Sequence, residues 1–144
     1  MKRLSTTFLF LLIVLGACQR QEPPTSKAVR SEQAIKTIID DFFLALGSND
    51  STKLKGLLTD DFHMFEHDQR WNADSLRSLM PKTVGRQWEV SELIINQDKE
   101  LIHVSYFNNS LNPKGKSWFE SMLLTDSESG LRMKFMHSTK LYLK

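Results

Sequence analysis

SEQAIKTIIDDFFLAL, residues 31–46, is the stretch that decides the fold class. Its apolar residues recur three and four positions apart, the spacing that places side chains on one face of an α-helix. They are Ile35, Ile38, Ile39, Phe42, Phe43 and Leu46. The stretch therefore predicts a long amphipathic helix with one buried face. Ser31 is the predicted N-cap and Gly47 the predicted C-terminal stop.

Two shorter helices are predicted to follow. Residues 52–58 fit the first, with Ser51 as its cap, and residues 72–80 fit the second, which Pro81 ends. Together the three predicted helices fill most of the first half of the chain that follows residue 30.

The second half changes to β-branched, aromatic and alternating residues, which favour strands. Strands are predicted over 87–96, 101–107, 117–125 and 132–143, separated by turn-forming segments at 97–100, 112–115 and 126–130. Helices followed by an antiparallel meander make an α+β domain, and its length suits one core rather than two. The predicted domain covers residues 31–144.

Three segments of this domain resemble the nuclear transport factor 2-like superfamily, which includes the SnoaL-like cyclases and the ketosteroid isomerases. They are DDFFLALGSND (40–50), LLTDDFHMFEHD (57–68) and GLRMKFMHST (130–139). The resemblance implies a cone, in which a curved antiparallel sheet wraps around the N-terminal helices and leaves a pocket in its mouth. It also implies that the segment after the second helix is a strand. Dimers through the open face of the sheet are common in this superfamily, so a homodimer is one expected partner.

Glu66 is the first candidate for chemistry. In the ketosteroid isomerases the catalytic base lies four residues along this strand from a DDA-type start, and counting from Phe62 leads to Glu66. Because side chains alternate along a strand, Phe62, Met64 and Glu66 are predicted to share one face. A carboxylate in an apolar pocket has a raised pKa and suits a general base. The alternative is a solvated, inert carboxylate at the pocket rim.

His137 is the second candidate. It has the same parity as Met133, Phe135 and Thr139 along the last predicted strand. It is either a core histidine or, if it faces Glu66 across the cone, the partner of an acid–base pair. The predicted ligand pocket consists of Met64, Glu66, Trp118, Phe135 and His137.

His63-Met64-Phe65-Glu66-His67 matches the signature of the inverted zinc peptidases. Zinc binding would need a helix, because on a strand the two histidines stand roughly 13 Å apart at about 3.3 Å per residue. Two ligands of one ion cannot be so distant when each zinc–nitrogen bond is about 2.1 Å. We interpret the segment as a strand, and neither a metal nor a cofactor is expected.

The N-terminus has the layout of a secretory signal. Lys2 and Arg3 precede the apolar run FLFLLIVL at 8–15, which is too short to span a bilayer. Leu15-Gly16-Ala17-Cys18 resembles the lipobox of bacterial lipoproteins. Residues 1–17 are therefore predicted to be a lipoprotein signal peptide, with Cys18 lipidated. Residues 18–30 are polar and contain two adjacent prolines, so they are predicted to be a flexible tether.

Charge and anchor limit the function. The chain has 19 basic and 17 acidic residues, and loss of Lys2 and Arg3 would leave a net charge of zero. No basic stripe with interleaved aromatic residues is present, so nucleic-acid binding is not expected.

The favoured function is a lipid-anchored module of the cell envelope that binds a small, mostly apolar ligand or a protein partner. The alternatives are an enzyme with Glu66 as general base and a structural dimerisation module. Gln19 after the cysteine is not acidic, which favours the outer membrane if the host is Gram-negative.

Overall fold

The computed structural model describes residues 29–98, 101–127 and 130–142. The predicted signal peptide, Cys18 and nearly all of the predicted tether lie outside these residues. No helix within the described ranges is long and apolar enough to cross a membrane.

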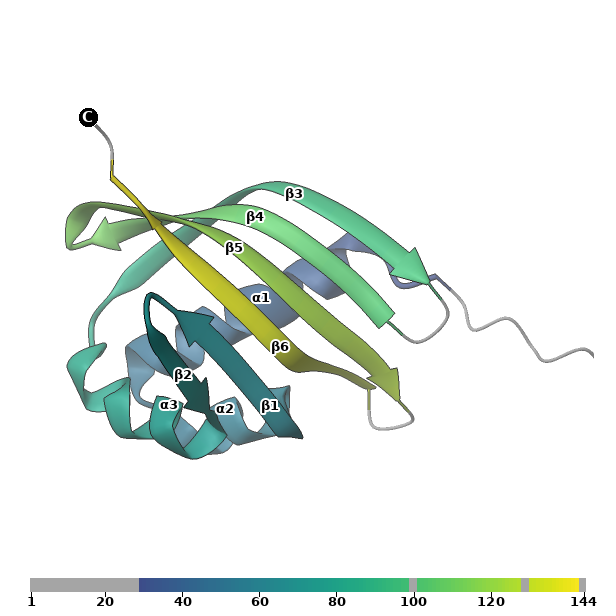
Figure 1. Ribbon diagram of the computed structural model, residues 1–144, viewed down its shortest axis with the longest axis horizontal. Helices are drawn as coiled ribbons and strands as arrows, with labels where there is room; N and C mark the ends of the chain where they lie inside the picture. The colour runs from purple at the N-terminus through teal and green to yellow at the C-terminus, as the bar shows by residue number, and fades with distance from the viewer. Residues whose placement is uncertain (1–28, 99–100, 128–129, 143–144) are drawn as a thin grey trace, which may run out of the picture.

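The helices all precede β3 along the chain and cover one face of a curved sheet (Figure 1). They are α1 (Glu32–Ser48), α2 (Ser51–Leu57), α3 (Ala73–Leu79) and the short 3-10 helix η1 (Met80–Lys82). The strands are β1 (Leu58–Glu66), β2 (Gln69–Asn72), β3 (Gln87–Asp98), β4 (Leu101–Asn112), β5 (Lys114–Ser127) and β6 (Gly130–Leu141). They form one six-stranded sheet in the order β2-β1-β6-β5-β4-β3.

The antiparallel meander of β3 to β6 agrees with the sequence prediction. Two features of the sheet differ from it. β1 pairs with β6 in parallel, so the sheet is mixed rather than wholly antiparallel. β2, only four residues long and mostly polar, was not predicted and pairs with β1 at the edge of the sheet. A strand this short has too few alternating residues to show a period.

The ends of the first two helices are set by polar caps. The Ser31 hydroxyl accepts from the backbone N–H of Ala34 at 3.2 Å, as predicted for the N-cap of α1. The predicted stop at Gly47 is wrong, because α1 continues to Ser48 and ends at Asn49 in the left-handed conformation, with φ 57°. The predicted cap of α2 is also one residue off: Asp50 caps it, not Ser51.

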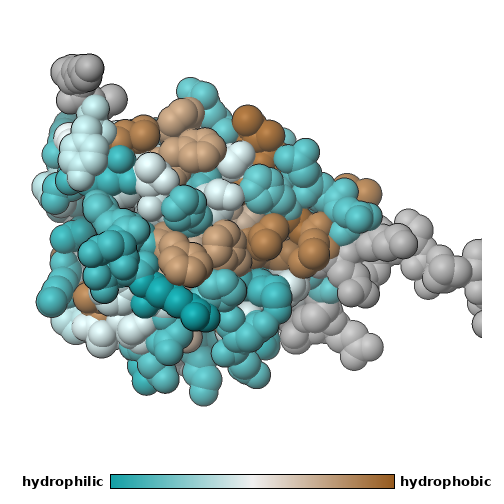
Figure 2. Space-filling view, in the orientation of Figure 1, coloured by the Kyte–Doolittle hydropathy of each residue, from teal (hydrophilic) through white to brown (hydrophobic). Residues whose placement is uncertain are grey.

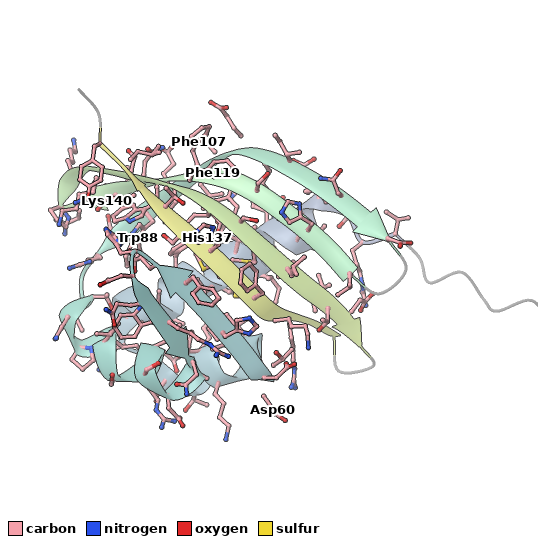
Figure 3. All side chains as sticks on the ribbon, viewed as in Figure 1. Asp60, Trp88, Phe107, Phe119, His137 and Lys140 are labelled. Atoms are coloured by element: carbon pink, nitrogen blue, oxygen red, sulfur yellow. The ribbon has the colours of Figure 1, made fainter. Side chains whose placement is uncertain are left out.

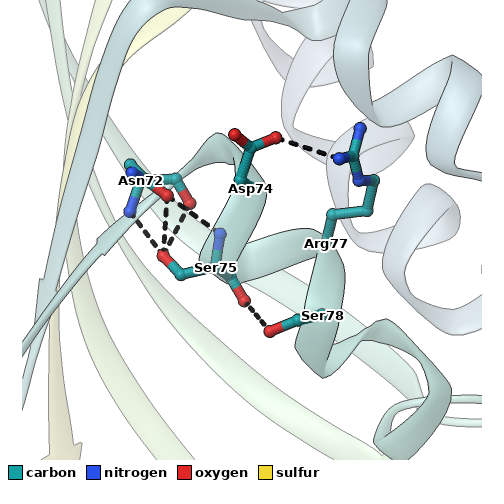
Figure 4. A network of polar contacts seen from close by, with 5 residues as sticks. All are labelled: Asn72, Asp74, Ser75, Arg77 and Ser78. Atoms are coloured by element: carbon teal, nitrogen blue, oxygen red, sulfur yellow. Dashed lines mark hydrogen bonds and ion pairs between the residues drawn. The ribbon is translucent and has the colours of Figure 1, made fainter.

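α3 begins at a reciprocal capping box (Figure 4). The Asn72 side chain accepts from the Ser75 backbone N–H at 2.9 Å, and the Ser75 hydroxyl accepts from the Asn72 backbone N–H at 2.7 Å. Such a box satisfies two backbone donors that the first turn of a helix leaves unpaired. At its other end, α3 runs into η1, which contains Pro81.

The hydrophobic core lies between α1 and the inner face of the sheet. Ile35, Ile39 and Phe42 of α1 are almost completely buried. From the strands, the most buried apolar side chains are Val104, Met122, Leu124, Met133 and Met136. The helical face predicted from residues 31–46 is therefore the face that packs on the sheet.

Arg30 ties the start of α1 to the far ends of two strands. Its guanidinium donates to both carboxylate oxygens of Asp126 on β5, at 2.8 and 2.7 Å. Its backbone N–H and carbonyl both bond the Gln97 amide on β3, at 3.0 and 2.8 Å. Residue 30 is thus fixed at the end of the sheet where β3 and β5 finish.

The opposite side of the sheet, turned toward the viewer in Figure 1, carries no helix of the described part of the chain. We call its central rows the outer sheet face, defined by His63, Phe65, Ser91, Ile94, Asn96, His103, Ser105, Phe107, Phe119, Ser121, Leu123, Phe135, His137 and Thr139. None of these residues is Asp, Glu, Lys or Arg. Figure 2 shows hydrophobic residues gathered across this side of the molecule.

Candidate functional site

A cavity of about 250 Å³ opens between α1, α3 and the inner face of the sheet. Aromatic and aliphatic side chains form most of its wall: Phe42, Phe43, Leu46, Met64, Leu76, Leu79, Trp88, Trp118 and Met136. Its polar lining consists of Glu66, Lys82, Thr83, Arg86, Asn108, Glu120 and Ser138. A mostly apolar cavity with a few converging polar groups is the usual form of a small-molecule site.

Residues 83–86, which form part of the rim of the cavity, are hydrogen-bonded to the end of α1. The Gly85 backbone N–H donates to the Gly47 carbonyl at 2.9 Å, and the Thr83 hydroxyl donates to the Leu46 carbonyl at 2.8 Å. A Cβ atom at Gly47 would lie 2.5 Å from the carbonyl oxygen of Arg86. Glycine is therefore needed at position 47 for close approach of the two backbones, not as a helix stop.

Glu120 of β5 is the buried acidic group of the cavity and is only 2% exposed. Its Oε1 accepts from the Asn108 side-chain amide at 3.3 Å, while its Oε2 has no hydrogen-bond partner among the described residues. Burial raises the pKa of Glu120 to about 8; Ser138 and Asn108 lower it in part, and the charge of Glu66 raises it further. At neutral pH this carboxyl is therefore mostly protonated and can donate a hydrogen bond.

Tyr106 and Asn108 of β4 extend the polar cluster. Within the described part of the chain, neither the Tyr106 hydroxyl nor the Asn108 side-chain oxygen has a hydrogen-bond partner. Burial, followed by the charges of Glu120 and Asp40, raises the pKa of Tyr106 well above its usual range. A buried polar group without a partner is costly, so such groups point to a ligand or ordered water that satisfies them.

Glu66 lies at the end of β1, where it lines the cavity together with Met64. Its side chain is 33% exposed, against 2% for Glu120 as a residue. The predicted alternation is correct, since Phe62 and Met64 are buried and Phe65 is exposed. Glu66 and Glu120 thus line the same cavity but differ in environment: the Glu66 carboxyl is partly solvated and the Glu120 carboxyl is buried.

Phe135 and His137 do not lie in the cavity, which corrects their predicted placement. Lys134 is an extra residue in β6, because Leu123 pairs with Phe135 whereas Leu124 pairs with Met133. This β-bulge reverses the parity of the strand, so that Met133 and Met136 both face inward.

His137 therefore pairs with Phe65 and lies on the outer sheet face with Phe107 and Phe119 (Figure 3). The residue opposite Glu66 is Ser138, which lines the cavity. Of the five predicted pocket residues, the structure brings Met64, Glu66 and Trp118 together there.

The segment from His63 to His67 is strand and turn rather than helix. His63 lies within β1 and His67 in the turn after it, with φ 55°. The two histidines therefore do not share the helical face that the zinc-peptidase signature requires. Within residues 29–98, 101–127 and 130–142, no cluster of three or more His, Cys, Asp or Glu residues could hold a metal ion.

Glu120, Asn108 and Ser138 are the buried polar residues of the cavity, and the sequence prediction missed all three. A signal was present for Glu120, which alternates with Trp118, Met122 and Leu124 on the apolar parity of its strand. A carboxylate among inward-facing apolar residues is unusual enough to mark a site. Asn108 has less contrast, because the polar residues Asn109 and Ser110 follow it in the sequence.

No protein-family model matches the chain, and no curated protein matches it in sequence. Solved structures do match its fold. An NTF2-like protein from Cytophaga hutchinsonii superposes with a TM-score of 0.69 at 12% identity, covering 78% of this chain and 100% of the other. A Streptomyces avermitilis protein of the NTF2-like family, proposed to be a dehydratase, gives 0.68 at 14% identity, covering 77% and 96%. The CaMKII hub of S. rosetta gives 0.68 at 8% identity, covering 79% and 99%.

These likenesses confirm the predicted fold class. The chain has the α+β architecture of nuclear transport factor 2-like proteins, with helices inside an open, curved, six-stranded sheet. At 8 to 14% identity they establish the fold alone. Function must therefore be argued from the cavity and the surfaces of this chain.

Proposed function

We propose that this protein is a lipid-anchored module of the cell envelope that binds a small, mostly apolar molecule in the cavity. The observation that supports ligand binding is the state of Glu120. Its carboxyl is buried in an apolar wall and mostly protonated, and one of its oxygens has no hydrogen-bond partner among the described residues. A hydroxyl or carbonyl of a ligand could accept from that carboxyl. The anchor rests on the sequence around Cys18, which resembles a lipobox.

Two neighbouring residues of β5 allow a matched test of the cavity. Trp118 lines it, whereas Phe119 lies on the outer sheet face. Native mass spectrometry of the gently extracted protein should detect a co-purifying small molecule in the wild type and in Phe119→Ala. Trp118→Ala should lose at least about nine-tenths of the bound fraction, because a wall of the cavity is removed. Equal occupancy in both variants would contradict binding in the cavity.

An enzyme is the second candidate, favoured by the two carboxyls that meet in one cavity. Glu120 is mostly protonated at neutral pH, and its pKa responds to the charge of Glu66. Carboxyls held in different environments are typical of an acid and a base that act together. In this alternative Glu66 is the general base, and loss of turnover in Glu66→Gln with ligand binding retained would distinguish catalysis from binding alone.

A homodimer is the partner that the outer sheet face favours. Phe65, Ile94 and Phe119 on this face are 41%, 61% and 40% exposed. Exposed apolar patches of this kind mark interaction sites. The similarity to a hub domain makes assembly compatible with the fold.

A further inference from the structure

Two cations line the cavity, Lys82 in η1 and Arg86 in the loop before β3. Lys82 is exposed and Arg86 is half-buried, so both lie at the rim rather than in the interior. Within the described part of the chain neither side chain is in an ion pair, although Glu66 lines the same cavity. Both cations are therefore available to an anionic group that enters the cavity.

The carboxylates outside the cavity do not engage Arg86 either. Arg86 also lines a second hollow, between α1 and β3, together with Asp40 and Glu89. Asp40 is ion-paired with Lys36, and neither carboxylate lies within 4.0 Å of the Arg86 guanidinium. The guanidinium thus keeps its planar set of donors, which matches the two oxygens of a carboxylate.

The backbone that carries the two cations is fixed on two sides. Besides its bonds to the end of α1, it is bonded to β4, where the Asn112 side-chain amide donates to the Gly85 carbonyl at 3.0 Å. Within the loop, the Arg86 backbone N–H donates to the Thr83 carbonyl at 3.0 Å. A site whose backbone is already ordered loses less entropy when a ligand binds. The cations are therefore presented at the rim before any ligand arrives.

The balance of charge in the cavity favours a ligand with one negative charge. With Glu120 mostly protonated, the charged groups of the lining are two cations, Lys82 and Arg86, and one anion, Glu66. The Glu66 carboxylate is 3.9 Å from the His67 ring, which does not line the cavity. An anionic ligand would gain charge-assisted hydrogen bonds at the rim, whereas a cationic ligand would meet two like charges there.

The wall of the cavity limits where that charge can lie. Its interior is mostly apolar and includes the ring pair of Phe43 and Trp88, whose centres are 5.4 Å apart. A charge taken into such a wall without a partner is costly, so the charged end of the ligand must stay at the rim. The volume of about 250 Å³ is below the roughly 300–1,000 Å³ of sites for drug-sized molecules, so the ligand is small.

Resting on the ligand binding proposed above, we propose that the ligand is a small organic acid whose carboxylate pairs with Arg86 and Lys82 at the rim while its apolar body fills the cavity. Arg86 is the main partner, because it is the less exposed of the two cations and can bind both carboxylate oxygens. The cavity then selects its ligand by charge as well as by size.

Three probes with the same phenyl body and different polar ends test this inference. Isothermal titration calorimetry of the purified full chain in a non-ionic detergent, at about pH 7.5, compares phenylacetate, phenylethyl alcohol and phenylethylamine. At this pH the acid is an anion and the amine a cation. We expect phenylacetate to bind at least about tenfold more tightly than the alcohol, because hydrogen bonds to charged groups are the stronger ones. The amine should bind most weakly.

Matched variants assign the preference to the rim. Arg86→Gln should lower the affinity for phenylacetate at least about fivefold and leave the affinity for the alcohol within about twofold. The control is Arg70→Gln on β2, which removes the same charge from an exposed residue outside the cavity and should change neither affinity. Trp118→Ala should weaken the binding of both probes, because it removes part of the wall that holds their common body.

The titrations separate this inference from the proposed function. Equal affinity for the acid and the alcohol, or a preference unchanged in Arg86→Gln, would overturn the anionic ligand and leave an apolar ligand in the cavity. Loss of affinity for both probes in Arg86→Gln would overturn its role as the anion's partner, because the residue would then support the shape of the cavity. Phenylacetate binding that survives Trp118→Ala would place the acid elsewhere. Absence of binding by all three probes would also overturn the inference, while the co-purified molecule would still decide the proposed function.

Discussion

At the residue scale, Glu120 makes the stability of the fold depend on pH, because its carboxyl is buried in an apolar wall. Its pKa is about 8 in the folded protein against an ordinary 4.5, so the folded state holds the proton more tightly than the unfolded state. The stability of the folded state therefore falls as pH rises from about 4.5 to 8. A pKa raised this far corresponds to on the order of 5 kcal/mol.

Glu120→Gln removes this loss, because an amide has no charge to bury and can still accept from Asn108. We expect the variant to unfold at higher urea than the wild type at pH 9, and near the same urea at pH 4.5. Urea titrations at several pH values measure the difference. A wild type whose stability does not fall between pH 5 and 9 would contradict a protonated, buried Glu120.

Individual residues also show where alternation along a strand predicts the direction of a side chain and where it fails. Glu66 and Met64 reach the cavity as alternation predicts, because β1 keeps a regular register from His63 to Glu66. Phe135 and His137 do not, because one inserted residue in β6 reverses their parity. Met133, Phe135 and Met136 place apolar residues in both parities of the strand, so the pattern does not locate the bulge.

At the element scale, the two glycines of the first helices have opposite roles. A Cβ at Gly47 of α1 would lie 2.5 Å from the Arg86 carbonyl oxygen, whereas a Cβ at Gly56 of α2 meets nothing within 4 Å. Gly47→Ala should therefore destabilise the fold by about 1–3 kcal/mol, because two backbones must move apart.

Gly56→Ala is the matched control for this change. It adds the same methyl group within a helix and should stabilise the fold by about 0.5–1 kcal/mol, since alanine has the better helix propensity. Thermal unfolding of both variants compares them directly. Similar changes in unfolding temperature, of the same sign in both variants, would show that the Arg86 carbonyl does not restrict the side chain at position 47.

Elements with long periodic patterns could be predicted from the sequence, and those fixed by distant contacts could not. The pattern over 31–46 places α1 within about two residues, because its buried face repeats over several turns. The parallel pairing of β1 with β6 joins residues about 70 positions apart and leaves no local trace. Asn49 rather than Gly47 ends α1, since the glycine serves a contact with the loop before β3.

At the scale of the whole molecule, the anchor and the folded domain are separable. If Cys18 bears the lipid, Cys18→Ser should move the protein from the membrane fraction to the aqueous fraction of the host envelope, because an acylated cysteine supplies the tether. Cell fractionation and intact mass measure the change. Ser26→Ala alters the same polar stretch without touching the thiol and should remain in the membrane fraction. An unlipidated Cys18 in the wild type would remove the proposed anchor.

The hydrogen bonds between Arg30 and the ends of β3 and β5 have a practical consequence for immobilising the protein through its N-terminus. Arg30 is fixed where β3 and β5 finish, whereas the cavity lies where β1 finishes and β3 and β5 begin. A surface attached through the N-terminus would therefore sit at one end of the sheet and leave the opening of the cavity at the other. A sensor chip loaded in this way presents the opening to flowing solution. On a bilayer, a chain anchored at Cys18 would likewise enter the domain at the end of the sheet away from the cavity.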